Sequence, residues 1–215
     1  MYTLLRTLLV CLLMSLVCSA FPADAAQPGS ARETAEKGAA VILGLLNDPA
    51  FKDPATRDAI RKQVEDEVLK LFDFEEFYTR TVGPQWRQFG PDQKKRFQTA
   101  FTDLLRNTYI DTLDSYSGEE IVFTGERSAN NGKRVEIQIQ FLAQDKAYPA
   151  AFRMLNKDGR WVVYDVVIEG ISMIKNYRDQ FRDILGKVSP DELIARVEAK
   201  AVEQLEKKKK AEEKP

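Results

Sequence analysis

Two periods of apolar positions run along this chain, and the change between them separates helical from extended segments. Between residues 32 and 116 the apolar side chains recur every three or four positions, which is the spacing of one helix face. The pattern predicts four helices in this part, over residues 32–46, 53–72, 73–82 and 91–116. Gly83-Pro84 and Gly90-Pro91 interrupt the pattern before the last of them.

From residue 120 the period changes to two, as in strands with one buried face. In KRVEIQIQFLA (133–143), four apolar residues from Val135 to Phe141 alternate with polar ones. Turn signals at residues 130–132 and 157–159 favour hairpins. We therefore expect four antiparallel strands, over residues 120–128, 133–143, 147–156 and 160–170. Because Pro149 cannot donate to a ladder, the third strand is predicted at an edge or a bulge.

The run YDVVIEGISMIKNYRDQF, residues 164–181, changes from strand to helix within one stretch. Its strand half is apolar except for Asp165, which is typical of a strand covered on both faces. Gly170 permits a turn and Ser172 is a candidate N-cap, so a helix follows. A last helix is expected to begin at Ser189-Pro190. The order of elements predicts an α+β domain, a curved antiparallel sheet of about four strands wrapped by N- and C-terminal helices.

The first 26 residues carry the features of a secretory signal peptide: one Arg, an apolar run from Leu8 to Val17, and small residues near Ala25. A transmembrane anchor is the alternative, but the run is shorter than the roughly 20 residues that span a bilayer. Both cysteines, Cys11 and Cys18, lie in this segment. We predict a signal peptide at 1–26, one domain at 27–205, and a charged, disordered tail at 206–215.

Charge and composition exclude several classes of function. The chain has 32 Lys and Arg against 33 Asp and Glu, so no overall field attracts nucleic acid. It has no His, which removes the commonest general base and the commonest metal ligand. We therefore expect neither a cofactor nor a metal, and most hydrolase and metalloenzyme interpretations are disfavoured.

Asp165 is the one charged residue inside the apolar strand, and a buried carboxylate there could act as a general base. The alternative is that it faces a polar edge or forms a structural ion pair with Arg153, Arg160 or Arg178. No motif marks a second catalytic group beside it, which favours the structural role.

Arg178 lies beside the apolar stripe of its helix, where a guanidinium could bind phosphate or carboxylate. An ion pair with Asp165, Glu169 or Asp179 is the favoured alternative. The many aromatic residues between 72 and 109 are compatible either with a packed core or with the wall of an apolar cavity.

Three motifs resemble the MlaC family of exported proteins, also called the toluene-tolerance auxiliary family. They are V-x-I-E-G-I-S at residues 166–172, N-Y-R-x-x-F at 176–181, and F-x-x-A-F-x-x-L-L-x-x-T-Y at 97–109. The similarity extends from about Val41 to Leu205. Gly90 stands where the family often has Ser or Thr, and the Lys-rich tail is outside the family pattern.

The resemblance implies a periplasmic carrier with a nuclear-transport-factor-like fold, which encloses phospholipid acyl chains in an apolar cavity between sheet and helices. Such carriers pass lipid between an outer-membrane lipoprotein complex and an inner-membrane ABC transporter complex with an MCE-domain protein, maintaining outer-membrane lipid asymmetry. One branch is associated with hopanoids. We expect a monomer. The lipid-binding residues implied by periodicity and resemblance are Phe97, Phe101, Leu105, Tyr109, Ile137, Ile139, Phe152, Met154, Val163, Val167, Ile174, Tyr177 and Phe181.

Two other functions stay open at the level of sequence. One is an enzyme on a similar cone-shaped fold, with Asp165 as the general base in the cavity. The other is an envelope adaptor with a filled core, which acts only through its surface.

Overall fold

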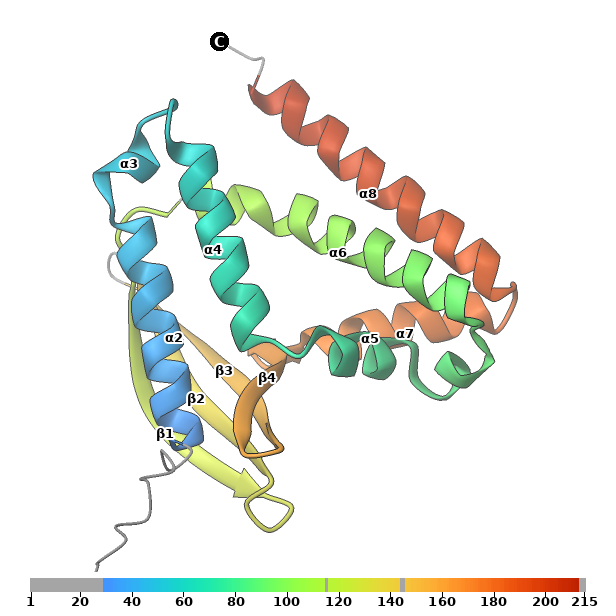
Figure 1. Cartoon of the computed structure of the whole chain (residues 1–215), viewed down its shortest axis with the longest axis horizontal. Coiled ribbons are helices and arrows are strands. Elements are labelled where there is room, and N and C mark those ends of the chain that lie inside the picture. The colour runs from blue at the N-terminus through green and yellow to red at the C-terminus, as the bar shows by residue number, and fades with distance from the viewer. Residues whose placement is uncertain (1–28, 115, 144–145, 213–215) are drawn as a thin grey trace, which may run out of the picture.

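The computed structural model describes residues 29–114, 116–143 and 146–212, which form helices, then an antiparallel sheet, then helices again (Figure 1). This confirms the predicted α+β class. The elements before the sheet are α2 (Ala31–Leu46), α3 (Pro49–Lys52), α4 (Arg57–Leu71), α5 (Phe74–Val82), the 3-10 helix η1 (Gly83–Gln88) and α6 (Pro91–Asp114). The sheet and the elements after it are β1 (Glu120–Ala129), β2 (Arg134–Ala143), β3 (Lys146–Lys157), β4 (Arg160–Ile168), β5 (Ile171–Ser172), α7 (Met173–Leu185) and α8 (Pro190–Glu212).

The sheet follows chain order, β1-β2-β3-β4-β5, and every neighbouring pair is antiparallel. Ile137 pairs with Phe152, and Phe152 pairs with Val166. Because directly paired residues share a face, these three lie on one face of the sheet, which we call the inner face. Helix α2 covers part of it, with Ala31 and Ala35 buried against the strands. Small side chains on α2 allow this close approach.

The buried apolar side chains of the described residues form three clusters. The helical cluster joins residues of α5, η1, α6, α7 and α8. The sheet cluster joins α2 with β2, β3 and β4. The third, smaller cluster holds Leu46, Phe51, Ile60 and Val64, from α2, α3 and α4. A domain usually has one contiguous core, so this division is a distinctive feature of the molecule.

Several local expectations differ from the structure. Helix α4 begins at Arg57, because the Asp53 carboxylate accepts from the Ala55 amide in a turn before the helix. Strand β3 lies between β2 and β4 and is not an edge strand. Pro149 is tolerated there because it lies just beyond the last β3–β4 pair, where β4 turns and the Glu169 amide donates to the Pro149 carbonyl. Helix α8 continues to Glu212 and so includes most of the segment that the sequence predicted as a charged tail from residue 206. The predicted signal peptide lies outside the described residues.

Asp73 connects the sheet to the helices at the start of α5. Its amide donates to the Val163 carbonyl of β4 at 2.8 Å. Its carboxylate accepts from the Glu76 amide at 3.0 Å and from Lys157 Nζ at 2.7 Å. Partial burial alone would raise the pKa of Asp73, but the hydrogen bonds from Lys157 and from the Glu76 amide hold it below its ordinary value.

We predict that Asp73→Asn lowers the free energy of unfolding by roughly 1 kcal/mol at pH 7, because it removes one charge of a partly exposed pair. The folded-state pKa is depressed, so this stabilisation is complete above the unfolded pKa of about 3.9 and is lost as pH falls through the lower folded value. Urea titrations of wild type and variant should therefore converge near pH 2. Lys157→Met should behave in the same way. If wild type and variant differ in unfolding free energy by the same amount at pH 7 and at pH 2, the Asp73–Lys157 pair is not the source of the stabilisation.

Candidate functional site

Asp165 is buried to 2% exposure, and both of its carboxylate oxygens accept hydrogen bonds. Oδ1 accepts from the Ile174 amide at 3.0 Å. Oδ2 accepts from Ser172 Oγ at 2.6 Å and from Arg153 Nη1 at 3.1 Å. Two of these donors belong to the first turn of α7 and its N-cap, so the carboxylate fixes the position where strand becomes helix. The geometry is that of a structural anchor.

The partner of Asp165 is Arg153, one of the three predicted. Arg153 also donates through Nε to Glu136 on β2 at 2.9 Å. Partial burial would lower the pKa of Arg153, but its hydrogen bond with Glu136 and the charge of Asp165 raise it above its ordinary value. The result is a polar row across β2, β3 and β4 on the outer face of the sheet, where Glu136 pairs with Arg153 and Arg153 with Asp165.

Arg178 makes a different contact from the one predicted. Its Nε donates to the backbone carbonyl of Arg80 near the end of α5 at 2.6 Å, so it ties α7 to α5. Asp179 pairs with Arg182 instead. The expected ion pair of Arg178 was therefore wrong, because its side chain reaches the free carbonyls at the end of a helix.

Five of the predicted wall residues lie in the helical cluster. The rings of Phe97 and Phe101 on α6 lie 5.6 and 5.2 Å from that of Phe181 on α7, and Phe101 lies 4.8 Å from Tyr177. Ile174 is buried in the same cluster. These rings meet edge to face, which is a favourable arrangement in a packed core. The structure thus places them inside the helical layer.

Four other predicted wall residues, Ile137, Ile139, Met154 and Val163, are fully buried in the sheet cluster, which Ala31 and Ala35 of α2 share. Val167 lies elsewhere. It pairs with Ala151 and Ser172, on the same face as Asp165 and opposite to Phe152. The periodicity was misleading at Val167 because β4 contains a bulge opposite Arg153 and Met154, which shifts the alternation.

The remaining predicted residues, Leu105, Tyr109 and Phe152, keep part of their surface exposed: Leu105 packs against the edge of the helical cluster and Phe152 against that of the sheet cluster. Tyr109 is 40% exposed, while Leu105 and Phe152 are half-buried. Tyr109 also approaches Tyr177: burial, and then the contact with Tyr109, raise the pKa of Tyr177 above its ordinary value. Leu105 and Tyr109 are four residues apart on one face of α6.

Sequence reasoning missed other apolar residues that also stay exposed. Ile168 (41% exposed) and Tyr148 lie on the inner face of the sheet beyond α2, beside half-buried Phe141 and Val166. Leu69 is 46% exposed on α4. A signal was present in the alternation of β2, which includes Phe141, and in the position of Leu69 outside the apolar stripe of its helix.

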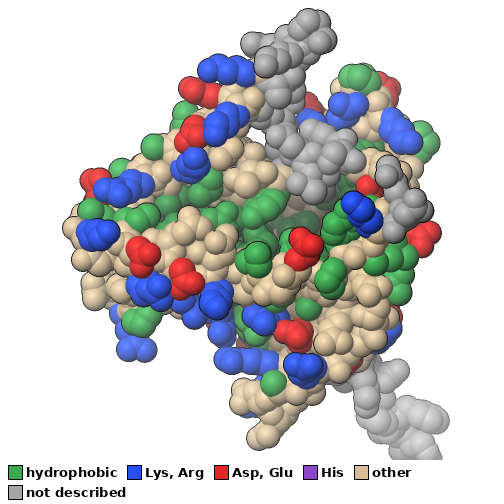
Figure 2. All heavy atoms as spheres, turned by 180° about the vertical axis from the view of Figure 1, so that it is seen from behind, with side chains coloured by type: hydrophobic (Ala, Val, Ile, Leu, Met, Phe, Trp, Pro, Cys, Tyr) green, Lys and Arg blue, Asp and Glu red, His purple; other side chains and the backbone are tan. Residues whose placement is uncertain are grey.

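Hydrophobic side chains also gather at the surface. Figure 2 shows them across the middle of the face opposite to that of Figure 1, where the surface is hollowed between the helical half and the sheet. A separate groove of about 690 Å³ lies between α6 and α8. Its rim is charged, with Lys95, Arg96, Asp103, Arg106 and Glu198 among the lining residues. Within the described part of the chain, no helix combines the length and apolar character needed to cross a membrane.

The model of the family described as "MlaC protein" matches residues 37–199, so this chain belongs to the MlaC family. It is 24% identical over 179 residues to the intermembrane phospholipid transport system binding protein MlaC of Haemophilus influenzae, covering 78% of this chain and 84% of that protein. It is 31% identical over 106 residues to the toluene tolerance protein ttg2D of Pseudomonas putida, or 49% of each chain.

The fold is similar to that of a phospholipid-binding protein from Ralstonia solanacearum, whose structure was solved in complex with a phospholipid. The TM-score is 0.74 at 20% sequence identity, and the match covers 82% of this chain and 99% of that one. At this identity the likeness shows a shared fold.

We predict that Asp165→Asn destabilises the protein by roughly 3 kcal/mol, because it removes a buried charge that holds Arg153 and the first turn of α7. Urea unfolding measures the change. Asp183→Asn is the control, since that side chain is 72% exposed and paired only at 3.6 Å with Arg182. If Asp165→Asn lowers the free energy of unfolding no more than Asp183→Asn does, the anchoring role of Asp165 is refuted.

Proposed function

We propose that this protein is a periplasmic carrier that binds the acyl chains of a phospholipid between the inner face of the sheet and helices α6 and α7. One observation carries the proposal: the apolar interior is divided into a helical and a sheet cluster, and large apolar side chains packed against each of them remain partly exposed. Leu105 and Tyr109 supply the helical wall, while Phe141, Phe152 and Val166 supply the sheet wall. An acyl chain bound there would complete a core that the protein leaves open.

The energetics suit a carrier. Transfer of one methylene group from water to an apolar site contributes about 0.8 kcal/mol, so two acyl chains of about thirty methylenes in total gain on the order of 20 kcal/mol. A bilayer provides nearly the same gain. Loading and unloading are then decided by docking to other proteins, because the lipid itself is almost equally stable in either place.

The names of the relatives support this cargo and an exchange between membranes. The Haemophilus influenzae relative is named as a binding protein of an intermembrane phospholipid transport system. By analogy, we propose that this chain is exported by its first 26 residues and acts with an inner-membrane MCE-domain ABC transporter complex and an outer-membrane lipoprotein complex. A hopanoid is the alternative cargo.

The arrangement around Asp165 favours a carrier over an enzyme. A general base needs a lone pair directed at its substrate, but three donors from α7, its N-cap and Arg153 already engage this carboxylate. It lies on the face of the sheet opposite to the proposed lipid wall.

The cargo can be identified directly. The protein is purified from the cell envelope, extracted with organic solvent, and the extract is analysed by mass spectrometry against a mock purification. We expect phospholipid in near-stoichiometric amount. A hopanoid in the extract would redirect the proposal to another lipid. If the extract contains no lipid and the folded protein also takes up no added phospholipid, the proposal is refuted.

We predict that Phe152→Glu reduces bound phospholipid at least ten-fold, because a carboxylate on the inner face must be desolvated against the acyl chains. Val122→Glu is the matched control: Val122 pairs with Gln140 on the opposite face of the same sheet and is already 39% exposed. Lipid per protein is measured by extraction, and circular dichroism checks that both variants fold. Equal retention of lipid by the two folded variants would contradict the proposed wall.

A further inference from the structure

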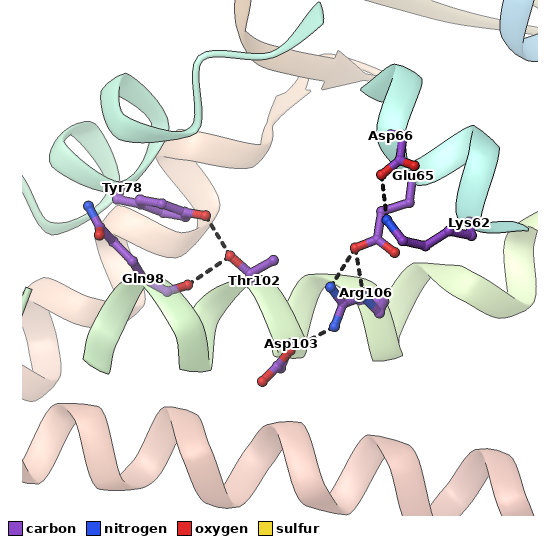
Figure 3. A network of polar contacts seen from close by, with 8 residues as sticks. All are labelled: Lys62, Glu65, Asp66, Tyr78, Gln98, Thr102, Asp103 and Arg106. Carbon is purple, nitrogen blue, oxygen red and sulfur yellow. Dashed lines mark hydrogen bonds and ion pairs between the residues drawn. The ribbon is translucent and has the colours of Figure 1, made fainter. Parts of the chain in front are cut away.

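Helix α6 is tied to the two helices that precede it by polar contacts one turn apart. Figure 3 shows Thr102 meeting Tyr78 of α5, and Arg106 meeting Glu65 of α4. The Tyr78 and Thr102 hydroxyls are 2.6 Å apart. Arg106 Nε and Nη2 both donate to Glu65 Oε1, at 3.0 and 2.5 Å. Each contact links α6 to a segment more than twenty residues away.

The two contacts differ in the apolar packing that surrounds them. Tyr78 is buried in the helical cluster together with Phe97 and Phe101 of α6, so α5 and α6 share an apolar core. Helix α4 places Ile60 and Val64 in the third cluster, and none of the α6 side chains described, residues 91–109, is among its buried members. Glu65–Arg106 is thus a polar contact between the middle of α4 and α6.

The ion pair adjoins the proposed lipid site. Thr102, Leu105, Arg106 and Tyr109 follow one another at helical spacing on neighbouring faces of α6, so Arg106 lies next to the proposed helical wall. On α4, Leu69 follows Glu65 by one turn and is 46% exposed. The Glu65–Arg106 pair therefore joins α4 to α6 within one turn of Leu105 and Tyr109, where we propose that the acyl chains lie.

We infer that Glu65 and Arg106 form a clamp that controls how fast lipid enters and leaves the site, an inference that rests on the proposed function. The pair is partly exposed, with side chains 31% and 43% accessible. Exposed ion pairs are weak, so this one can open without unfolding the domain. Opening separates α4 from α6 and uncovers the acyl chains, while the shared core of α5, α6 and α7 stays intact.

The charges around the clamp keep it closed at rest. Arg106 Nη1 donates to Asp103 at 2.8 Å, which orients the guanidinium along α6. Lys62 on α4 is engaged by Asp66 at 2.5 Å, one turn from Glu65. Arg106 therefore faces two carboxylates, and Lys62 of α4 is itself paired.

The test compares two ion pairs that both start from an arginine of α6. Glu65→Gln and Arg106→Gln break the pair with α4. Glu198→Gln is the control, because Glu198 pairs with Arg96 at 3.2 Å and joins α6 to α8 within the helical layer. The full-length mature protein is loaded with phosphatidylethanolamine carrying a fluorescent acyl chain, and transfer to vesicles of phosphatidylethanolamine and phosphatidylglycerol is followed by fluorescence.

We expect transfer to be roughly two- to five-fold faster in both clamp variants and unchanged in Glu198→Gln, with the double clamp variant no faster than either single one. In 1 M salt, where the Debye length is about 3 Å, the ratio of variant to wild-type rates should approach one. Hydrogen exchange of α4 amides should rise in the clamp variants, while unfolding midpoints stay close to wild type.

The two proposals fail differently in this experiment. If every protein takes up lipid but the clamp variants release it at the wild-type rate, or the control accelerates equally, the clamp is refuted and the carrier stands. If the folded wild type takes up no labelled phospholipid and contains none on extraction, the proposed function falls and the clamp falls with it.

Discussion

The buried carboxylate of Asp165 is the interaction on which the arrangement of the molecule depends. It receives hydrogen bonds from β3, through Arg153, and from the N-cap and first turn of α7. These bonds fix where the sheet ends and where the helical layer begins. Since α7 packs on α5 and α6, the angle between sheet and helices is set at this carboxylate. A charge is suited to the task because its acceptor sites are directional, whereas apolar contact allows sliding.

Because polar groups join the sheet to the helical layer, these two layers need not merge into one apolar core. Asp165 and Asp73 join β4 to α7 and α5 through polar groups, so the apolar side chains of each layer can pack within that layer. The rings of Phe97, Phe101 and Phe181 fill the helical side, while α2 covers Ile137 and Ile139. Apolar side chains at the edge of each cluster stay partly exposed, and a domain of this size normally buries such surface against itself. A hydrocarbon ligand is the simplest way to cover it.

Much of this fold could be predicted from the sequence because its signals are local. The alternation of β2, the turns at 130–132 and 157–159, and the cap at Ser172 all depend on neighbours a few residues away. The candidate site could be predicted less well. Periodicity indicates which side chains are buried but not what buries them, so Phe101, which meets other rings, and Phe152, which keeps exposed surface, look equivalent in the sequence. At Val167 the bulge in β4 reversed the face, and no local pattern marks that bulge.

The proposed clamp joins α4 to α6 by a pair of charges, and this chemistry suits a wall that moves. An apolar seam between them would contribute about 25 cal/mol for each Å² removed from water and would close the molecule for good. Glu65 and Arg106 hold the helices in register, yet water solvates both groups whenever the pair opens. The polar contact at Tyr78 lies over a shared aromatic core and has no such freedom. The proposed carrier must both retain and release hydrocarbon, which requires one firm wall and one wall that can move, and in this proposal α6 borders both.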